Sequence, residues 1–282
     1  EAAHSLLLSI GRWLPADNPY PARLGVSTAQ PDYPVGPLPD EHRVDLRHLP
    51  ALAIDDEGSG DPDDAISWDG EILWVHVADV AALVPPDSPA DIEARYRAAN
   101  LYLPEGTVRM LPDELTDRLA LGLQPESPAL SIALVPTPDG DFELAQFALS
   151  WLRVTRTTYE MAESRLDESP YRELLEIGAR NRQRRLAGGA VEIDLPEVKI
   201  KAAVDGTVTI MPLPSLRSRE LVREAMLMAG EAVGRFGTIN NLPLAFTVQD
   251  PPFENESLPK DLTGASPSVM WAQRRVMQRS RQ

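Results

Sequence analysis

The chain has 282 residues, 43% of them hydrophobic, which is enough for one large domain with a sizeable core. It has no cysteine, which excludes disulfides and thiolate metal sites, and no apolar run as long as a membrane span, so we expect a cytoplasmic protein without membrane contact. The net charge of −16 argues at first sight against nucleic-acid binding, but residues 1–150 hold 8 Lys and Arg against 26 Asp and Glu, whereas residues 151–282 hold 19 against 17.

The first 41 residues are predicted to form an N-terminal segment and linker. Residues 4–13 are typical of a short amphipathic helix or strand, and residues 14–39 contain seven prolines, which indicates a connecting segment. The main domain is therefore predicted to span residues 42–282. Because the first residue is glutamate and not methionine, we expect a fragment or a processed chain.

An acidic run at residues 55–64 is the most informative feature of the chain, with six carboxylates within ten residues. Gly58, Gly60 and Pro62 favour an irregular loop, which could be solvated or could turn several carboxylates onto a hard cation such as Mg²⁺. Acidity alone favours the solvated loop. The strand-like segment 72–80, rich in β-branched and aromatic residues, predicts instead that the loop is held against the core. An EF-hand is disfavoured because Ile66 occupies the twelfth position, where a glutamate is required.

Hairpins and helices alternate along the rest of the chain. This predicts an α+β fold, with an antiparallel or mixed twisted sheet flanked by helices. We expect strands at 72–80, 129–135, 142–155, 191–200, 207–211 and 245–248, and helices at 91–99, 171–186, 218–236 and 270–281.

Several sequence blocks resemble, in order and spacing, the RNB catalytic domain of the RNase II and RNase R exoribonucleases. They are the acidic run, His76-Val77-Ala78-Asp79-Val80, Leu101-Tyr102-Leu103-Pro104, Met110-Leu111-Pro112 and Thr158-Tyr159-Glu160, and the resemblance extends from about Asp45 to about Pro252. It implies a monomeric, hydrolytic 3′→5′ exoribonuclease that degrades single-stranded RNA to nucleoside 5′-monophosphates with up to two Mg²⁺ or Mn²⁺ ions.

The resemblance assigns the catalytic centre to four aspartates. Asp55, Asp61 and Asp64 match the family's metal ligands, and Asp63 matches the aspartate most closely tied to cleavage. One tight turn can aim Asp61, Asp63 and Asp64 at a common point, as two-metal phosphodiester hydrolysis needs. We therefore predict that all four act as metal ligands and catalytic residues: Asp55, Asp61, Asp63 and Asp64. Asp56 and Glu57 match no functional position and are expected to be solvated.

Two further residues are predicted to contact RNA. Tyr159 resembles the family aromatic that stacks near the 3′-terminal nucleotides, although taken alone it would be read as a core tyrosine. Glu224 matches a family helix that lines the site. Ile193 stands where some members have a second stacking phenylalanine. His76 is expected to be a hydrogen-bonded strand residue and not a general base.

Other features leave the activity open. Basic clusters at 180–185, 217–223 and 274–281 could neutralise phosphates, but a solvated helix face explains the first equally well. The Ser-Pro-hydrophobic-Arg block and the OB-folds typical of the family are not recognised, so the domain is expected to be truncated on its C-terminal side. Two alternatives remain: an RNA-binding or regulatory module with an incomplete or inactive site, and a metal-binding structural domain without RNA affinity.

Overall fold

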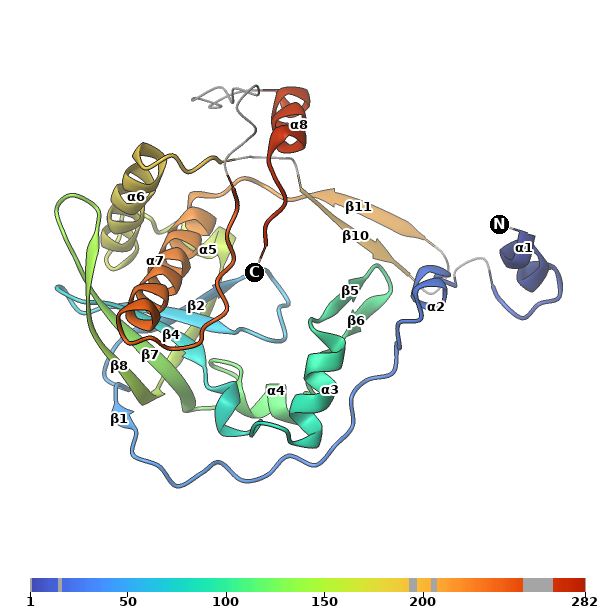
Figure 1. The fold of residues 1–282 in the computed structure, drawn as a ribbon, viewed down its shortest axis with the longest axis horizontal. Coiled ribbons are helices and arrows are strands. Elements are labelled where there is room, and N and C mark those ends of the chain that lie inside the picture. Colours follow the sequence, from blue (N-terminus) through green and yellow to red (C-terminus); the bar gives the residue numbers. More distant parts are fainter. Residues whose placement is uncertain (1, 15–16, 193–196, 204–206, 251–265, 282) are drawn as a thin grey trace. The chain divides into compact units, whose positions relative to one another are not determined.

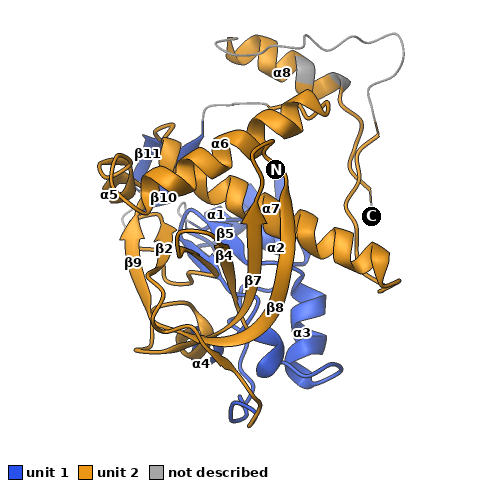
Figure 2. Cartoon of the chain, turned by 90° about the vertical axis from the view of Figure 1, so that its left-hand side faces the viewer, with its two compact units in different colours: residues 1–39, 80–116, 197–213 blue, residues 40–79, 117–196, 214–282 orange. Residues whose placement is uncertain are grey.

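The computed structural model of the protein describes residues 2–14, 17–192, 197–203, 207–250 and 266–281. It divides into two compact units (Figure 2). Unit 1 comprises residues 1–39, 80–116 and 197–213, and unit 2 comprises residues 40–79, 117–196 and 214–282. Because two internal segments group with the N-terminal residues, this division differs from the boundary expected near residue 42. A domain over residues 42–282 stays a prediction.

Unit 2 is built on a seven-stranded mixed sheet with the strand order β1-β8-β7-β4-β3-β2-β9 (Figure 1). The β1–β8 and β2–β9 pairs are parallel, and the other neighbours are antiparallel. This confirms the predicted α+β class with a mixed sheet. The strands are β1 (Val44–Asp45), β2 (Ala51–Asp55), β3 (Asp64–Trp68), β4 (Leu73–Ala78), β7 (Ser127–Pro136), β8 (Phe142–Leu152) and β9 (Val154–Thr158).

The hairpin predicted over residues 129–155 is confirmed as β7 and β8, but its second strand continues differently. Only Arg153 separates β8 from β9, and β9 pairs with β2 at the other end of the strand order. The sheet must therefore curl for one chain segment to reach both ends. This curl places the end of β9 beside the end of β2.

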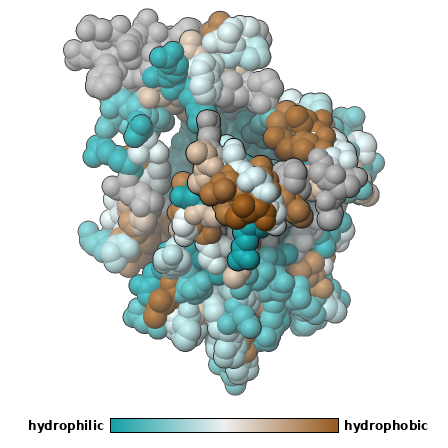
Figure 3. Space-filling model, turned by 90° about the vertical axis from the view of Figure 1, so that its right-hand side faces the viewer, coloured by the Kyte–Doolittle hydropathy of each residue, from teal (hydrophilic) through white to brown (hydrophobic). Residues whose placement is uncertain are grey.

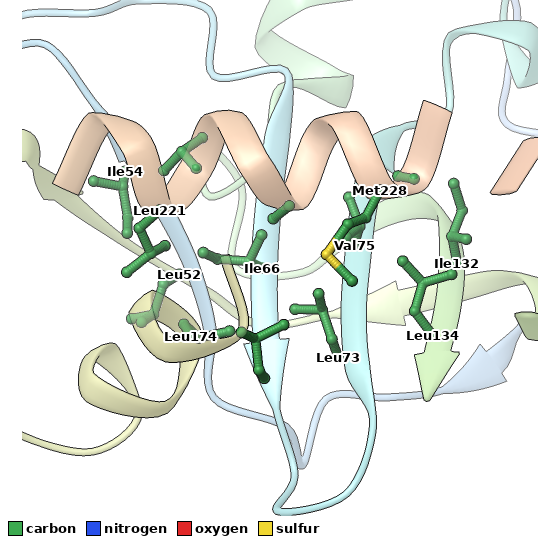
Figure 4. Packing of buried hydrophobic residues seen from close by; sticks show 14 of the residues in the cluster. Leu52, Ile54, Ile66, Leu73, Val75, Ile132, Leu134, Leu174, Leu221 and Met228 are labelled. Carbon is green, nitrogen blue, oxygen red and sulfur yellow. The ribbon is translucent and has the colours of Figure 1, made fainter. Parts of the chain in front are cut away.

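Three helices of unit 2 follow the sheet strands: α5 (Tyr159–Glu163), α6 (Tyr171–Ala187) and α7 (Arg217–Ile239). The predicted helices at 171–186 and 218–236 are thereby confirmed. Leu52 and Ile54 of β2 belong to one apolar cluster, and Ala53 between them belongs to another, as the two-residue period of a strand requires. Figure 4 shows the first cluster between α7 and the sheet, with Leu221 and Met228 contributed by α7.

Two glycines allow close packing around α6. A Cβ on Gly178 would lie 3.2 Å from the Cβ of Glu224 on α7, so the glycine lets the two helices approach closely. Gly140, in the β7–β8 turn, has φ +86°, and an added Cβ would lie 2.4 Å from the Arg180 carbonyl oxygen. The turn and α6 are therefore in contact through their backbones.

Unit 1 contains short elements. The hairpin of β10 and β11 confirms the one predicted at 191–200 and 207–211, with a later start, and its apolar residues at positions 198, 200, 208 and 210 are 44–63% exposed. Figure 3 shows apolar side chains at the surface on one side of the molecule. The elements are α1 (Ala2–Ser9), α2 (Tyr20–Leu24), η1 (Val80–Ala82), α3 (Pro89–Arg97), β5 (Leu101–Leu103), β6 (Gly106–Val108), β10 (Val198–Ala202) and β11 (Val208–Pro212), and α4 (Asp113–Leu119) leads from unit 1 into unit 2.

Two predictions near the C-terminus were wrong in extent. The segment 245–248 is not a strand, because an isolated bridge joins Val248 to Arg281 and no strand among the described residues supplies a ladder of hydrogen bonds. The last helix, α8 (Pro267–Val276), ends before the predicted residue 281. Among the helices that the structure describes, none combines the length and the apolar character needed to cross a membrane.

Candidate active site

The acidic run connects two antiparallel strands at one end of the unit 2 sheet. Asp55 is the last residue of β2 and Asp64 is the first residue of β3, so the strand ends hold these two aspartates at the same edge. The parallel β9 pairs with β2 in a register that sets Thr158 opposite Asp55. Tyr159, the next residue, therefore begins α5 beside the acidic loop.

The loop is fixed through its backbone. The Pro62 carbonyl accepts a hydrogen bond from the Leu121 N–H at 2.9 Å, and the Asp63 carbonyl accepts one from the Ala78 N–H at 2.9 Å. The Arg156 guanidinium donates to the Ser59 carbonyl at 2.5 Å. These bonds fix the backbone on both sides of Asp63, so its position does not depend on its own side-chain contacts.

Two aspartates of the acidic loop, Asp63 and Asp64, have raised pKa values. Burial raises the pKa of Asp64 to about 6, with further contributions from the negative charges of Asp55 and Asp63. Burial also raises the pKa of Asp63, and the negative charges of Asp61 and Asp55 act in the same direction. The Asp63 side chain nevertheless keeps solvent-exposed surface. All four predicted catalytic residues therefore belong to one electrostatic cluster, and concentrated negative charge is its main property.

The donor chemistry of this cluster suits a hard divalent cation. Carboxylate oxygens are the ligands that Mg²⁺ and Mn²⁺ take, and positive charge between the aspartates would relieve their mutual repulsion. Within the described ranges, however, no group of three or more potential ligands stands in an arrangement that could hold a metal ion. The side chains are close enough to interact, but their oxygens do not converge on one point.

Tyr159 lies against the same cluster. Burial raises its pKa to about 12, and the charges of Asp55 and Asp64 act in the same direction, so its hydroxyl stays protonated at neutral pH. The guanidinium carbon of Arg219 lies 4.1 Å from the centroid of the Tyr159 ring, which is the geometry of a cation–π contact. Tyr159 therefore lies beside the acidic loop, while its contact with RNA stays a prediction.

Glu224, the other residue predicted to contact RNA, is buried between two helices, and its contact with RNA stays a prediction. Its side chain is 1% exposed and lies between α6 and α7. The carboxylate accepts a hydrogen bond from Asn181 Nδ2 at 2.8 Å and hydrogen bonds from Arg185 at 2.6 and 3.1 Å. These bonds join α6 to α7, which gives Glu224 a structural role in this part of the fold.

Asp56 was expected to be solvated, and the structure corrects this expectation. It accepts a short hydrogen bond from the Arg219 guanidinium, which joins the acidic loop to the first turns of α7. The cluster 217–223 was noted in the sequence, but nothing in the local pattern distinguishes Arg219 from Arg217 or Arg223. The pairing is between residues 163 positions apart, so only the fold identifies it.

The basic cluster 180–185 largely serves the protein's own structure. Arg182 pairs with Glu192, and Arg184 with Glu231 at 2.5 Å. With Arg185 bound to Glu224, three arginines of the cluster are neutralised by carboxylates. The segment is therefore neither a free RNA-binding surface nor a plain solvated helix face, which were the two alternatives for it.

His76 is a buried strand residue, as predicted. It lies in a chain of side chains across the sheet: Ser67 Oγ is 3.0 Å from Nε2, and Nδ1 is 2.7 Å from Ser131 Oγ. Burial lowers the pKa of His76 to about 3, so the ring is neutral. The residue is fully buried and contacts none of the four aspartates through these bonds. Ile193, the other candidate in an RNA-contacting position, lies outside the described residues.

A separate pocket of about 270 Å³ lies within unit 1. It contains none of the predicted site residues, and its lining combines apolar groups with arginines that pair with Glu93 and Asp113. The predicted site residues therefore lie at the acidic loop and not in this cavity. The pocket is lined by Leu24, Gly25, Val26, Ser27, Tyr96, Arg97, Ala99, Leu101, Val108 and Arg109.

Comparison with known proteins agrees with the fold and the motif order. The RNB domain family profile matches residues 43–266, which include the acidic loop, Tyr159 and α7. The chain belongs to the RNB domain family. This confirms the predicted relationship to RNase II and RNase R.

Individual relatives show how much of such a protein the chain represents. It is 34% identical over 284 residues to an uncharacterised ribonuclease of Synechocystis, an alignment that covers 93% of this chain and 42% of the relative. The chain therefore spans less than half the length of that protein.

Solved structures support the RNB fold. RNase R of Mycoplasma genitalium, in complex with ribose-methylated single-stranded RNA, aligns with a TM-score of 0.67 and 22% identity, covering 74% of this chain and 36% of that one. The yeast pseudonuclease Ssd1 aligns with the same TM-score and 18% identity, covering 87% and 36%. The same fold thus occurs in a protein named as a nuclease and in one named as a pseudonuclease, so the fold alone does not decide activity.

Proposed function

We propose that this RNB protein is a hydrolytic 3′→5′ exoribonuclease that degrades single-stranded RNA to nucleoside 5′-monophosphates and requires Mg²⁺ or Mn²⁺. The observation that supports it best is the electrostatic cluster of four aspartates at the end of β2 and β3, beside Tyr159, in a chain of this family. A protein that needed only a scaffold would gain nothing from concentrating mutually repelling carboxylates on a backbone-anchored loop.

Each residue has a role in this proposal. The four aspartates of the acidic loop would hold up to two divalent cations. When bound, the cations would supply an activated water and neutralise charge on the phosphate. Asp63, the exposed member, would meet the scissile phosphate, and the other three aspartates are half-buried. Tyr159 offers a ring for the terminal bases, and base–aromatic stacking is worth about 1–3 kcal/mol per base without sequence preference. The proposed ligands are Asp55, Asp61, Asp63 and Asp64.

Asp63→Asn tests the proposal directly. With 5′-labelled single-stranded RNA and Mg²⁺, the wild-type protein should produce a descending ladder that ends in short products, and 3′-labelled RNA should release mononucleotide from the start. Loss of a key electrostatic group costs about 10²-fold or more in rate, so Asp63→Asn should retain under about a tenth of wild-type turnover and bind RNA almost normally. Glu57→Gln, an exposed acid of the same loop, is the matched control and should remain active.

Metal binding has its own measurement. Titration of RNA-free protein with Mn²⁺, followed by the electron paramagnetic resonance of the free ion, should show binding that weakens in Asp63→Asn and not in Glu57→Gln. Mn²⁺ binding without cleavage of RNA would instead support a structural metal domain.

A second candidate function is an RNA-binding or regulatory module with an inactive site. The likeness to a pseudonuclease fold and the absence of convergent ligand oxygens within the described ranges favour it. It predicts RNA binding that Asp63→Asn leaves unchanged and no Mg²⁺-dependent shortening of RNA by the wild-type protein.

A further inference from the structure

Arg219 joins three parts of the candidate site. It is the third residue of α7, its guanidinium donates to Asp56 of the acidic loop, and the same group covers the Tyr159 ring at 4.1 Å. A single side chain thus contacts the loop that carries the aspartates and the ring proposed to receive the terminal bases. These contacts fix the guanidinium from two directions.

Helix stability does not account for this placement. A cation in the first turn of a helix faces the positive end of the macrodipole, which costs roughly 0.3–1 kcal/mol. The first turn of α7 is stabilised by another group, because Glu163 Oε2 accepts a hydrogen bond from the Ser218 N–H at 2.8 Å. Arg219 is therefore positioned by Asp56 and Tyr159 against the preference of its own helix.

The hydrogen-bonding capacity of the Arg219 guanidinium is not fully used. Among the described residues its one side-chain hydrogen bond runs from Nη2 to Asp56, so the Nη1 N–H groups are unused, whereas Nε is buried without an acceptor and is closed to a ligand. An arginine carries five N–H donors in a planar fork that matches the oxygens of a phosphate. The side chain is 29% exposed, so a ligand can reach part of the group. A cation with spare donors, held beside a strongly negative cluster, is suited to receive an anionic ligand there.

We propose that Arg219 binds a backbone phosphate of the RNA next to the nucleotide at Tyr159, with Asp56 and Tyr159 holding the guanidinium in place. This inference rests on the proposed function, because it takes RNA as the ligand and Tyr159 as the stacking ring. It assigns to one residue the link between base recognition and phosphate recognition. It also gives Asp56 a role as a positioning residue.

Salt-dependent RNA binding separates this role from a structural one. Each phosphate contact on a single strand contributes about 0.7 to the slope of log K against log salt concentration. In an Asp63→Asn background, Arg219→Gln should weaken binding of a single-stranded oligonucleotide by about tenfold, the loss expected for one charged hydrogen bond, and should reduce that slope by about 0.7. Arg223→Gln is the matched control, since it removes the same charge one turn further along α7, where Arg223 pairs with Glu192 and Glu220.

The conservative variant adds a second readout. Arg219→Lys keeps the charge and should keep the slope, but an ammonium cannot cover the ring as a guanidinium does, so the length of the limit product should change in an otherwise active protein. A fall in melting temperature in both variants, with the slope and products unchanged, would overturn the inference and leave Arg219 a structural residue.

Failure of the inference and failure of the proposed function give different results. If the wild-type protein cleaves RNA and Arg219→Gln binds with the wild-type slope, only the inference fails. If Arg219→Gln lowers the slope and the wild-type protein never shortens RNA, the exoribonuclease proposal fails and the phosphate contact stands. If the wild-type protein has no affinity for RNA, both fail.

Discussion

Replacing Glu224 by glutamine distinguishes its predicted contact with RNA from the buried role that the structure gives it. The carboxylate is 1% exposed, and its partner Arg185 is 21% exposed. The substitution removes the negative charge nearest the Arg185 guanidinium and leaves it only the longer ion pair to Glu192 at 3.8 Å. Breaking a buried ion pair on one side typically costs 3–5 kcal/mol.

The partial exposure of Arg185 lets water replace some of the lost interaction, so we expect the lower end of that range, about 3 kcal/mol. For a chain of this size the loss corresponds to a fall in melting temperature of about 6–12 °C. The control is Glu220→Gln on the same helix, whose side chain is 43% exposed and whose ion pairs are worth about 0–1 kcal/mol.

The assay is a thermal melt beside a measurement of RNA affinity at a temperature where both variants are folded. We expect Glu224→Gln to melt early and to bind RNA as the wild-type protein does. An unchanged melting temperature together with weakened RNA binding would show that Glu224 reaches the nucleic acid and that its burial between α6 and α7 has been misread.

Two further variants test other parts of the site and the core. Tyr159→Ala should change the length of the limit product on an RNA gel, and Tyr159→Phe should not, because only the ring stacks. Identical products from the wild type and both variants, with a lower melting temperature for Tyr159→Ala, would indicate a core role only. The pKa of His76 is about 3 in the folded protein, against about 6.5 in an unfolded chain, so its contribution to stability is complete above pH 6.5 and is lost as the pH falls toward 3. Wild-type protein should therefore lose about 1.4 kcal/mol more than His76→Gln between pH 7.5 and 5.5 in urea melts. Parallel pH profiles for wild type and His76→Gln would contradict the buried neutral imidazole.

Local patterns predicted the long helices α6 and α7 and the strands β4, β7 and β8, because these elements depend on neighbouring residues, whereas β2 and β3, which carry the acidic loop, were not among the expected strands. The period of apolar positions in 218–236 predicted α7, and the Pro138-Asp139-Gly140 turn predicted the β7–β8 hairpin. The segment 245–248 has a strand-like composition, but it lacks a partner strand in the described chain, and composition cannot report that. The curl that takes one segment from β8 to β9 is likewise a long-range property of the sheet.

The candidate site was predictable to the extent that its residues are adjacent in sequence. The four aspartates fall within one loop, so their mutual influence follows from spacing, whereas the pairing of Thr158 with Asp55 that brings Tyr159 to them depends on a parallel pair of distant strands. Glu224 carried a signal that the family resemblance outweighed. It lies beside Ala225 and three residues after Leu221, on the apolar stripe of α7, where a carboxylate must be buried and paired.

Charge counts along the sequence gave a misleading picture of where RNA could bind, and ion pairing explains why. The second half of the chain has nearly balanced charges, but three arginines of the 180–185 cluster bind carboxylates of the same unit and offer little to a phosphate. Arg219 differs because its carboxylate partner, Asp56, belongs to the acidic loop itself. The ion pair therefore fixes positive charge at the edge of the negative cluster, where the proposed function would bring a phosphate. A local arrangement of this kind, and not the net charge of −16, determines whether an acidic protein can accept a polyanion.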